Sequence, residues 1–341
     1  MNAIAPALDD LNARIAALTA KHGDRVDALA LNITDRAGLL TLHPPGLESP
    51  NRACRLFRVA DGWMVLNLAR EEDRDLIPAW LSCDFGDAPW ALIAAHAPRH
   101  RRATLIERAI MLGLPAGGVG EIVRETPQAP LIQMAAGAAK ARRTLKVVDL
   151  SALWAGPMCG AILAAMGASV TKIESVRRPD PTRDATPEFF RRLNERKSDL
   201  RLDLSTPGDQ ERLREAIRGA DVFITSARPR AFAGLGVDPG AVFSDNPGLV
   251  WVAVTGYGWS GAAGVRVAFG DDAAAAGGIV RWNASGEPRF LGDALADPVT
   301  GLAAAEGALR AMDQGGGYLV DVSLAASAAG AAALCNLARA P

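Results

Sequence analysis

The sequence predicts an α/β fold in which a mostly parallel sheet carries helices on both faces, joined to a smaller α+β domain. From residue 146 onward, short apolar segments alternate with amphipathic segments of helical length, which is typical of a parallel sheet covered on both sides. The earlier residues lack that alternation. A chain of 341 residues is long enough for two domains. We therefore predict a small domain over 1–125, a linker over 126–145 and a large domain over 146–341.

The predicted small domain begins with a helix and contains one hairpin. Within residues 1–30, apolar side chains recur at three- and four-residue spacing and so share one helical face; they are Ile4, Leu8, Leu11, Ile15 and Leu18. Asp61-Gly62 separates two apolar stretches and is a typical hairpin turn. Residues 71–112 indicate several helical pieces. The stretch 113–145 is rich in Gly, Ala and Pro, as a connector between domains would be.

The large domain is predicted from apolar strands with helices between them. The strands cover residues 147–150, 169–175, 221–225, 249–257 and 317–324. Thr206 followed by Pro207 predicts a helix that has the threonine as its N-cap and the proline at its first position. In sheets of this kind, ligands bind beyond the carboxyl ends of the strands. The predicted binding loops therefore follow residues 150, 174, 225, 257 and 295.

Two of these loops have residues suited to an anion. Residues 151–156 run from a strand into a helix through small residues, and free amides at a helix start attract negative groups. Three arginines follow the second strand, and guanidinium binds phosphate bidentately; they are Arg177, Arg178 and Arg183. A plain turn and a solvated loop also explain these residues. The chain has no GxGxxG fingerprint and no Walker loop, so dinucleotide and P-loop binding have no support.

Three aspartates stand at predicted helix starts. Asp297 directly precedes Pro298, and we predict it as the N-cap of an alanine-rich helix. The same position keeps a carboxylate ionised, which a nucleophile requires, so capping and catalysis both remain open. Asp271 and Asp272 begin another alanine-rich helix. For these two we predict a role in complementing the helix dipole rather than in catalysis.

Composition excludes several other classes of function. The 37 basic and 38 acidic residues nearly balance, so we expect no nucleic-acid and no membrane partner. We find no signal peptide and no membrane-length apolar run. The four cysteines are far apart, which predicts free thiols in a reducing cytoplasm and no metal site.

Histidine is missing from the predicted large domain. All four histidines come before residue 145; they are His22, His43, His96 and His100. No Ser-His-Asp or Cys-His arrangement can therefore be assembled from that domain alone. A histidine base for proton abstraction is missing from it too.

Taken together, segments of residues 146–330 resemble the class III CoA-transferases, the CaiB/BaiF-type family that includes formyl-CoA and carnitine CoA-transferases. The matching segments occur in the family's order: VVDLSALWAGPMCGAILAAMGASVTKIES, then RKSDLRLDLSTPGDQERLREAIRGADVFITSARPRAFAGLG, NPGLVWVAVTGYGWSG, ALADPVTG and GGGYLVDVSL. Each motif alone is weak, but five in the same order are specific. The resemblance implies a Rossmann-like large domain.

The resemblance also implies a mechanism and a set of site residues. Asp297, in ALADPVTG, matches the family's catalytic aspartate, which forms a mixed anhydride with the acyl group and then a thioester with CoA. Coenzyme A and acyl-CoA enter as substrates, with no permanently bound cofactor, and a carboxylic acid is the other substrate. A homodimer is implied. The implied CoA contacts are Leu153, Trp154, Ala155, Leu202 and Ser226, with Arg177 or Arg178 on a phosphate.

The order of the parts differs from the family's usual order, because residues 54–119 resemble the small domain that normally follows the large one. The resemblance therefore implies a permuted and shortened chain. Racemases of the same fold use a histidine near the position of Phe269, and phenylalanine cannot transfer a proton. An isomerase that moves CoA within one molecule, and a CoA-binding protein without catalysis, remain alternatives.

Overall fold

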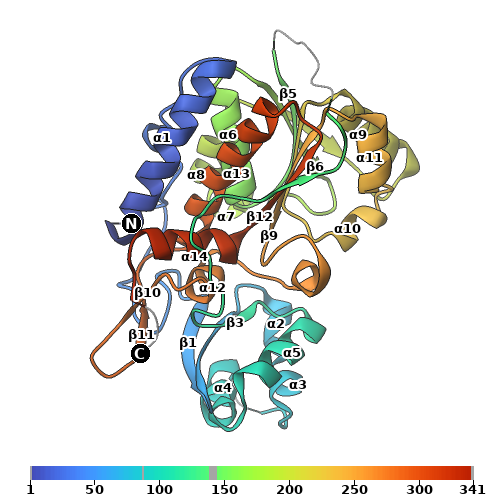
Figure 1. Ribbon diagram of the computed structural model, residues 1–341. Helices are drawn as coiled ribbons and strands as arrows, with labels where there is room; N and C mark the ends of the chain where they lie inside the picture. Colours follow the sequence, from blue (N-terminus) through green and yellow to red (C-terminus); the bar gives the residue numbers. More distant parts are fainter. Residues whose placement is uncertain (1, 87, 138–143, 339–341) are drawn as a thin grey trace.

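The computed structural model describes residues 2–86, 88–137 and 144–338 and has two parts, a large sheet with its helices and a small domain below it in Figure 1. Within these residues, the large sheet has seven strands in the order β4-β12-β9-β8-β5-β6-β7. All of its strand pairs are parallel except β12 with β4. The predicted α/β fold with a mostly parallel sheet is confirmed. The strands are β4 Leu131–Gln133, β5 Lys146–Leu150, β6 Ser169–Ser175, β7 Ser198–Leu202, β8 Val222–Thr225, β9 Val250–Thr255 and β12 Tyr318–Ser323.

Both faces of this sheet are buried, and the strand sequences show why. Successive side chains of a strand point to opposite faces. In β9, Val250, Val252 and Val254 belong to one apolar core, while Trp251 and Ala253 belong to the other. Because both faces of such a strand are buried, its sequence is a continuous run of apolar residues.

Helices cover the two faces (Figure 1). One face carries α1 (Ala5–His22), α6 (Ala155–Ala165), α8 (Pro187–Asn194) and α13 (Ala296–Asp313). The other carries α9 (Pro207–Gly219), α10 (Arg230–Ala233) and α11 (Pro239–Asp245). The short α7 (Thr182–Ala185) precedes α8, and α14 (Leu324–Leu334) follows β12. The predicted cap of α9 is confirmed, since Oγ1 of Thr206 accepts the N–H of Asp209 at 3.3 Å.

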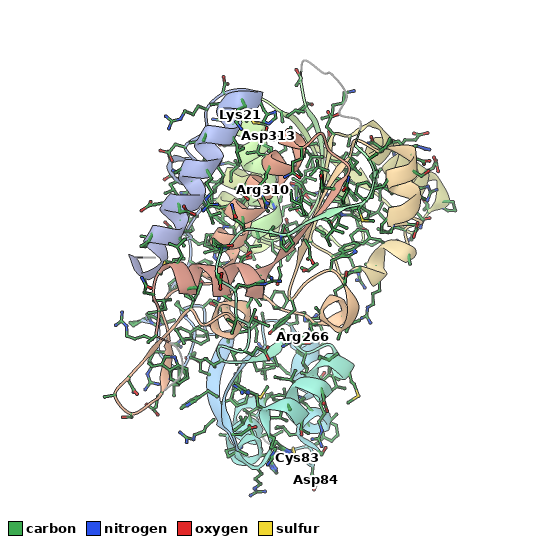
Figure 2. All side chains as sticks on the ribbon, in the orientation of Figure 1. Lys21, Cys83, Asp84, Arg266, Arg310 and Asp313 are labelled. Atoms are coloured by element: carbon green, nitrogen blue, oxygen red, sulfur yellow. The ribbon has the colours of Figure 1, made fainter. Side chains whose placement is uncertain are left out.

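The N-terminal helix packs on the large domain, although we predicted it with the small one. Its predicted apolar stripe is buried in the core that contains α13. At the far end of α1, Nζ of Lys21 lies 2.7 Å from Asp313, the last residue of α13 (Figure 2). The helix ends at His22, and Gly23 continues in an extended conformation. The stripe predicted the helix correctly, but a stripe alone does not say which surface covers it.

The small domain is an antiparallel sheet of order β1-β2-β3 with short helices. The predicted hairpin is confirmed, since Val59 of β1 pairs with Gly62 of β2. The core centres on the fully buried Trp80. The elements are β1 Cys54–Val59, β2 Gly62–Asn67, α2 Glu71–Asp75, α3 Ile77–Leu81, α4 Pro89–His96, α5 Arg102–Leu112 and β3 Ala116–Gly118.

Several segments connect the two parts. β4 lies inside the predicted linker and pairs with β12, so the linker supplies an edge strand of the large sheet; its residues 138–143 are outside the described ranges. α12 (Gly270–Ala276) packs against β2, β3 and α14. A hairpin of β10 (Val280–Trp282) and β11 (Pro288–Phe290) follows it. Among the described residues, no helix combines the length and apolar character needed to cross a bilayer.

Candidate active site

A cavity of about 870 Å³ lies between the two parts, at the carboxyl end of the large sheet. Its walls come from the loops after β5, β8 and β9 and from the start of α13. The first part of the chain contributes four polar side chains: Arg36, Asn51, Asn67 and Arg70. The cavity therefore lies at the strand ends where the sequence predicted a binding site.

Asp297 faces this cavity from the second position of α13. Our prediction that it is the N-cap is wrong, since Leu295 is the N-cap and the helix begins at Ala296. The N–H of Ala155, the first residue of α6, donates to its carboxylate. Two helix starts thus meet at one carboxylate, and helix starts favour an anion. Gly270 packs directly against it, because a Cβ there would collide with Oδ2 of Asp297.

The protein around Asp297 raises the pKa of its carboxyl group to about 7. Desolvation is the largest cause, because the ionised form loses its contact with water. Arg36 lowers this pKa, while the charges of Asp271 and Asp293 raise it. Near neutral pH the carboxylate is therefore both populated and poorly solvated, which suits a nucleophile.

Two residues from the N-terminal segment hold the acidic neighbours of Asp297. Arg36 donates to both carboxylate oxygens of Asp293, at 2.9 and 2.8 Å. Nδ2 of Asn51 donates to Asp271 at 2.7 Å and to Asp293 at 3.2 Å. Burial raises the pKa of Asp271 to about 6, and the charge of Asp293 is the next cause. The acidic neighbours of Asp297 are thus held by Arg36 and Asn51, two residues that are distant from them in sequence.

The two aspartates that begin α12 have different surroundings. Asp272 is buried and accepts the N–H of Phe269 at 2.9 Å, so it lies at the helix start as predicted. Burial raises the pKa of its carboxyl group well above the usual value, so its role in complementing the helix dipole stays a prediction. Asp271 lines the cavity together with Asp297, so a helix-start role alone does not describe it. The sequence did not show this difference, because it depends on how the start of α12 is turned toward the cavity.

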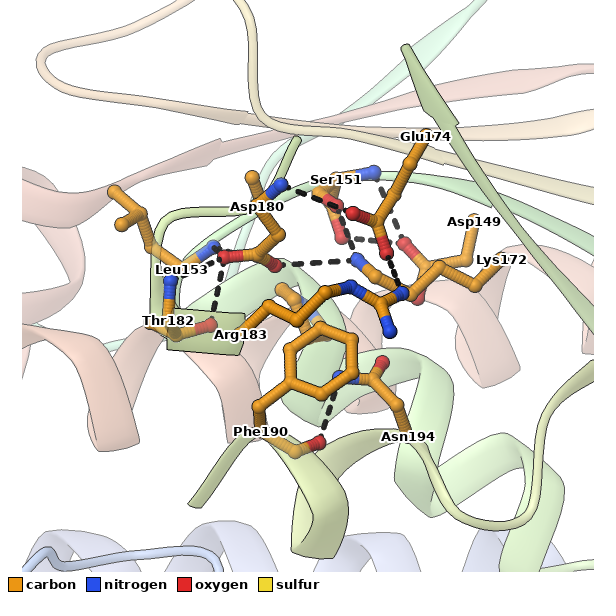
Figure 3. Close-up of polar contacts among 12 residues, drawn as sticks. Asp149, Ser151, Leu153, Lys172, Glu174, Asp180, Thr182, Arg183, Phe190 and Asn194 are labelled. Atoms are coloured by element: carbon orange, nitrogen blue, oxygen red, sulfur yellow. Dashed lines mark hydrogen bonds and ion pairs between the residues drawn. The ribbon is translucent and has the colours of Figure 1, made fainter. Parts of the chain in front are cut away.

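A buried ionic network fixes the loop after β5 (Figure 3). Asp180 accepts the N–H of Leu153 and Nζ of Lys172, each at 3.2 Å. Lys172 also donates to the carbonyl oxygen of Ser151 at 2.8 Å. Leu153 has a φ of 72°, a left-handed conformation that leucine rarely adopts. The network therefore holds a strained turn, and this turn leads directly to Ala155 beside Asp297.

We expect Lys172→Met to destabilise the protein by about 3–5 kcal/mol, because it leaves the Asp180 carboxylate buried without its cation. Both side chains are only 2 % exposed. Urea unfolding measures the change in the free energy of unfolding. Lys146→Met is the matched control, since Lys146 is exposed on β5 and should change stability by no more than about 0.5 kcal/mol. Equal effects of the two variants would contradict a structural role for the network.

Comparison with known proteins places this site in a family. The sequence model of CoA-transferase family III matches residues 143–336, more than half of the chain. The chain belongs to CoA-transferase family III. The resemblance drawn from the motifs is thereby confirmed. The solved structure of a CAIB/BAIF family protein from Brucella suis, which is 30% identical, aligns with a TM-score of 0.50 over 55% of this chain and 54% of that chain.

Curated relatives match the same part of this family III chain. Succinyl-CoA–D-citramalate CoA-transferase of Chloroflexus aurantiacus is 30% identical over 193 residues, which are 53% of this chain and 48% of the relative. Succinate–glutarate CoA-transferase of Agrobacterium fabrum is 30% identical over 199 residues, 53% of this chain and 50% of the relative. The chain thus spans about half the length of these relatives.

The structure brings most of the residues implied as CoA contacts to the cavity. Six of the eight predicted site residues line it: Leu153, Trp154, Ala155, Arg178, Ser226 and Asp297. Oγ of Ser226 accepts the N–H of Ala152 at 2.9 Å, so it also braces the loop after β5. Leu202 is instead buried in the core, and Arg177 is held by Asp203 at 2.9 Å outside the cavity wall. A CoA contact by these two residues stays a prediction.

Three residues that line the cavity of this family III chain, Arg36, Asn51 and Arg70, were not predicted from the sequence. They come from the first 125 residues and meet the nucleophile only through the tertiary fold, so no local motif marks them. Arg228 was inside a matching segment, SARPR, and the loop after residue 225 was a predicted binding loop. Its position was therefore available from the sequence, although its function was not.

Proposed function

We propose that this chain transfers coenzyme A from an acyl-CoA thioester to a carboxylic acid, with Asp297 as the nucleophile. The observation that carries the proposal is the position of Asp297 at the start of α13, open to an 870 Å³ cavity and contacted by the N–H of Ala155. The gap left by Gly270 gives the carboxylate room at the cavity wall. Acyl-CoA and the acid are substrates, and no permanently bound cofactor takes part.

In the proposed reaction, a carboxylate oxygen of Asp297 attacks the thioester carbonyl. The carbon–sulfur bond breaks, CoA leaves as thiolate, and a mixed anhydride remains on Asp297. The thiolate then attacks the Asp297 carbonyl, which releases the donor acid as carboxylate and forms an enzyme–CoA thioester. The acceptor carboxylate repeats these steps in reverse, so Asp297 is regenerated with no net proton transfer. This covalent route divides one difficult exchange into easier steps.

Trapping of the covalent intermediate tests the proposal. The protein is mixed with each member of a panel of acyl-CoA thioesters, quenched with hydroxylamine and analysed by peptide mass spectrometry. We expect a hydroxamate on Asp297 with a reactive thioester and none with free CoA alone. The peptide that carries Asp271 is an internal control and should stay unlabelled. No hydroxamate at Asp297 with any thioester would favour a binding protein without catalysis.

Two alternatives use the same cavity. An isomerase that moves CoA within one molecule would give the same hydroxamate but would need no added acid for turnover. Racemisation has less support, because Phe269, at the N-cap of α12, lines the cavity and cannot carry a proton. We also propose a homodimer as the working form, which light scattering of the purified chain would test.

A further inference from the structure

Six arginines line the cavity, and only some of them are neutralised. Three are paired with acidic side chains: Arg36, Arg70 and Arg266. Within the described part of the chain, three have guanidinium groups without a hydrogen bond or ion pair: Arg178, Arg228 and Arg230. The whole chain has a net charge of −1, so the excess of positive charge at the cavity wall does not follow from the composition of the chain. Unpaired guanidinium groups at a cavity wall indicate an anionic ligand.

The unpaired arginines occupy two separate places. Arg178 follows β6 and Arg228 follows β8, and these two strands lie on either side of β5 in the sheet. Neighbouring strands are about 4.8 Å apart, so the ends of β6 and β8 are separated by roughly 10 Å. The charges that act on Arg228 are those of Arg70 and Arg230 and not that of Arg178, so we assign an anion held by Arg228 to a different group from an anion held by Arg178.

Arg228 stands in a cluster of three arginines at the boundary of the small domain. Arg230 begins α10, and Arg70 is the N-cap of α2. All three also line a smaller adjoining cavity of about 210 Å³. Burial lowers the pKa of Arg228, and the charges of Arg230 and Arg70 lower it further. A bound anion would relieve this repulsion between like charges.

This cluster adjoins the nucleophile. The guanidinium carbon of Arg70 lies 5.7 Å from the ring centre of Phe269, and the next residue, Gly270, touches Asp297. In an acyl-CoA, the long pantetheine arm separates the phosphates from the sulfur. A second carboxylate on the acyl group, by contrast, is only a few bonds from the reacting carbonyl. The cluster is therefore placed for an anion on the acyl side of the thioester.

We propose that Arg228, with Arg70 and Arg230 beside it, binds the far carboxylate of a dicarboxylic acyl group. The preferred substrates are then CoA thioesters of dicarboxylic acids and the free dicarboxylic acids themselves. This inference rests on the proposed function for the thioester, and Arg178 remains the arginine for a CoA phosphate. Arg228 is the principal ligand, because Arg70 already gives two donors to Asp73, both at 2.7 Å.

Calorimetry with succinyl-CoA, butyryl-CoA and free CoA tests the proposal. The two thioesters have four-carbon acyl chains and differ in a terminal carboxylate or methyl group. The titrations use a chain that carries Asp297→Asn, so that no turnover occurs. We expect this parent to bind succinyl-CoA about tenfold or more tighter than butyryl-CoA, as a charge-assisted hydrogen bond provides. Adding Arg228→Gln should remove that preference and change the affinity for butyryl-CoA and CoA less than about twofold.

Matched variants show whether Arg228 binds the carboxylate of the acyl group or a phosphate of CoA. Arg178→Gln should weaken the binding of all three ligands by the same factor. Arg212→Gln should change none, because Arg212 is exposed on α9 and outside the cavity. Arg228→Lys keeps the charge and should retain part of the preference. If Arg228→Gln weakens all three ligands equally, its anion is a CoA phosphate and the proposal is overturned.

Two further results would also overturn the proposed carboxylate site. A parent chain without preference between the two thioesters overturns the proposal, even if Arg228→Gln fails to fold. Unchanged affinities in a folded Arg228→Gln chain, checked by circular dichroism, overturn it as well. The titrations need no chemistry. Failure to trap an adduct at Asp297 therefore counts against the proposed function, while a preference lost with Arg228 still supports the carboxylate site.

Discussion

Asp297→Asn is expected to lower CoA transfer by about 10³-fold or more while leaving CoA binding nearly unchanged, because an amide cannot form the covalent intermediate. Asparagine keeps the size and position of the side chain beside Gly270. Turnover is followed by chromatography of the acyl-CoA products, and binding by calorimetry. Activity that persists within tenfold of the native chain would show that another group attacks the thioester.

The pH dependence of thermal stability provides a control for the folding of the Asp297→Asn variant. The pKa of Asp297 is about 7 in the folded protein and 3.8 in the reference state. Between these two pH values, Asp297 holds a proton in the folded chain more often than in the unfolded chain. The contribution of Asp297 to the free energy of unfolding therefore falls as pH rises from about 4 through 7. Asp297→Asn removes this dependence, and its Tm at pH 8 should be no lower than that of the native chain.

Asp313→Asn is the matched substitution at the other end of α13. It removes contacts with Lys21 and His22, each at 2.7 Å, at the surface end of the helix, where the lysine side chain is 59% exposed. Surface pairs of this kind contribute about 0–1 kcal/mol each. We expect CoA transfer within about twofold of the native rate, since the effect on stability is small. A large loss in both variants would point to damage of the helix rather than to loss of a nucleophile.

Short-range patterns were enough to predict much of the fold. The Asp61-Gly62 turn, the N-cap Thr206 and the apolar strands act through neighbours in sequence, and each appears in the structure as predicted. The docking of α1 on α13 and the edge strand β4 depend on contacts between distant segments. Apolar periodicity shows that a face is buried, but it does not identify the surface that covers it.

The residues of the candidate site also fall into two groups, those with a local signal in the sequence and those without one. Asp297 and the loop after β5 have local signals, a carboxylate at a helix start and small residues after a strand. Arg36 and Asn51 have none, because they lie in an irregular segment more than 200 residues before the aspartates that they hold. The sequence could therefore identify the nucleophile but not the groups that set its charge.

Arg36→Leu is expected to move the acid limb of the pH–rate profile to higher pH by about one unit or more, since a neighbouring arginine lowers a carboxyl pKa by 1–3 units. The native chain should lose activity as pH falls below about 7, where Asp297 takes up a proton. Without Arg36, the ionised form of Asp297 loses its nearby cation, while the charges of Asp271 and Asp293 still oppose it. At pH 7 a smaller fraction of Asp297 is then ionised, and adduct formation slows.

Single-turnover formation of the Asp297 adduct between pH 5.5 and 9, at saturating acyl-CoA, measures this shift. Arg36→Lys keeps the charge and should restore most of the native midpoint, although it loses the two parallel bonds to Asp293. Asn51→Leu removes hydrogen bonds to the same acidic neighbours without removing a cation, and should move the midpoint less. A uniform loss of rate in Arg36→Leu with an unmoved midpoint would assign Arg36 to substrate binding. The ionisation of Asp297 would then be set by burial, by the charges of Asp271 and Asp293 and by the N–H of Ala155.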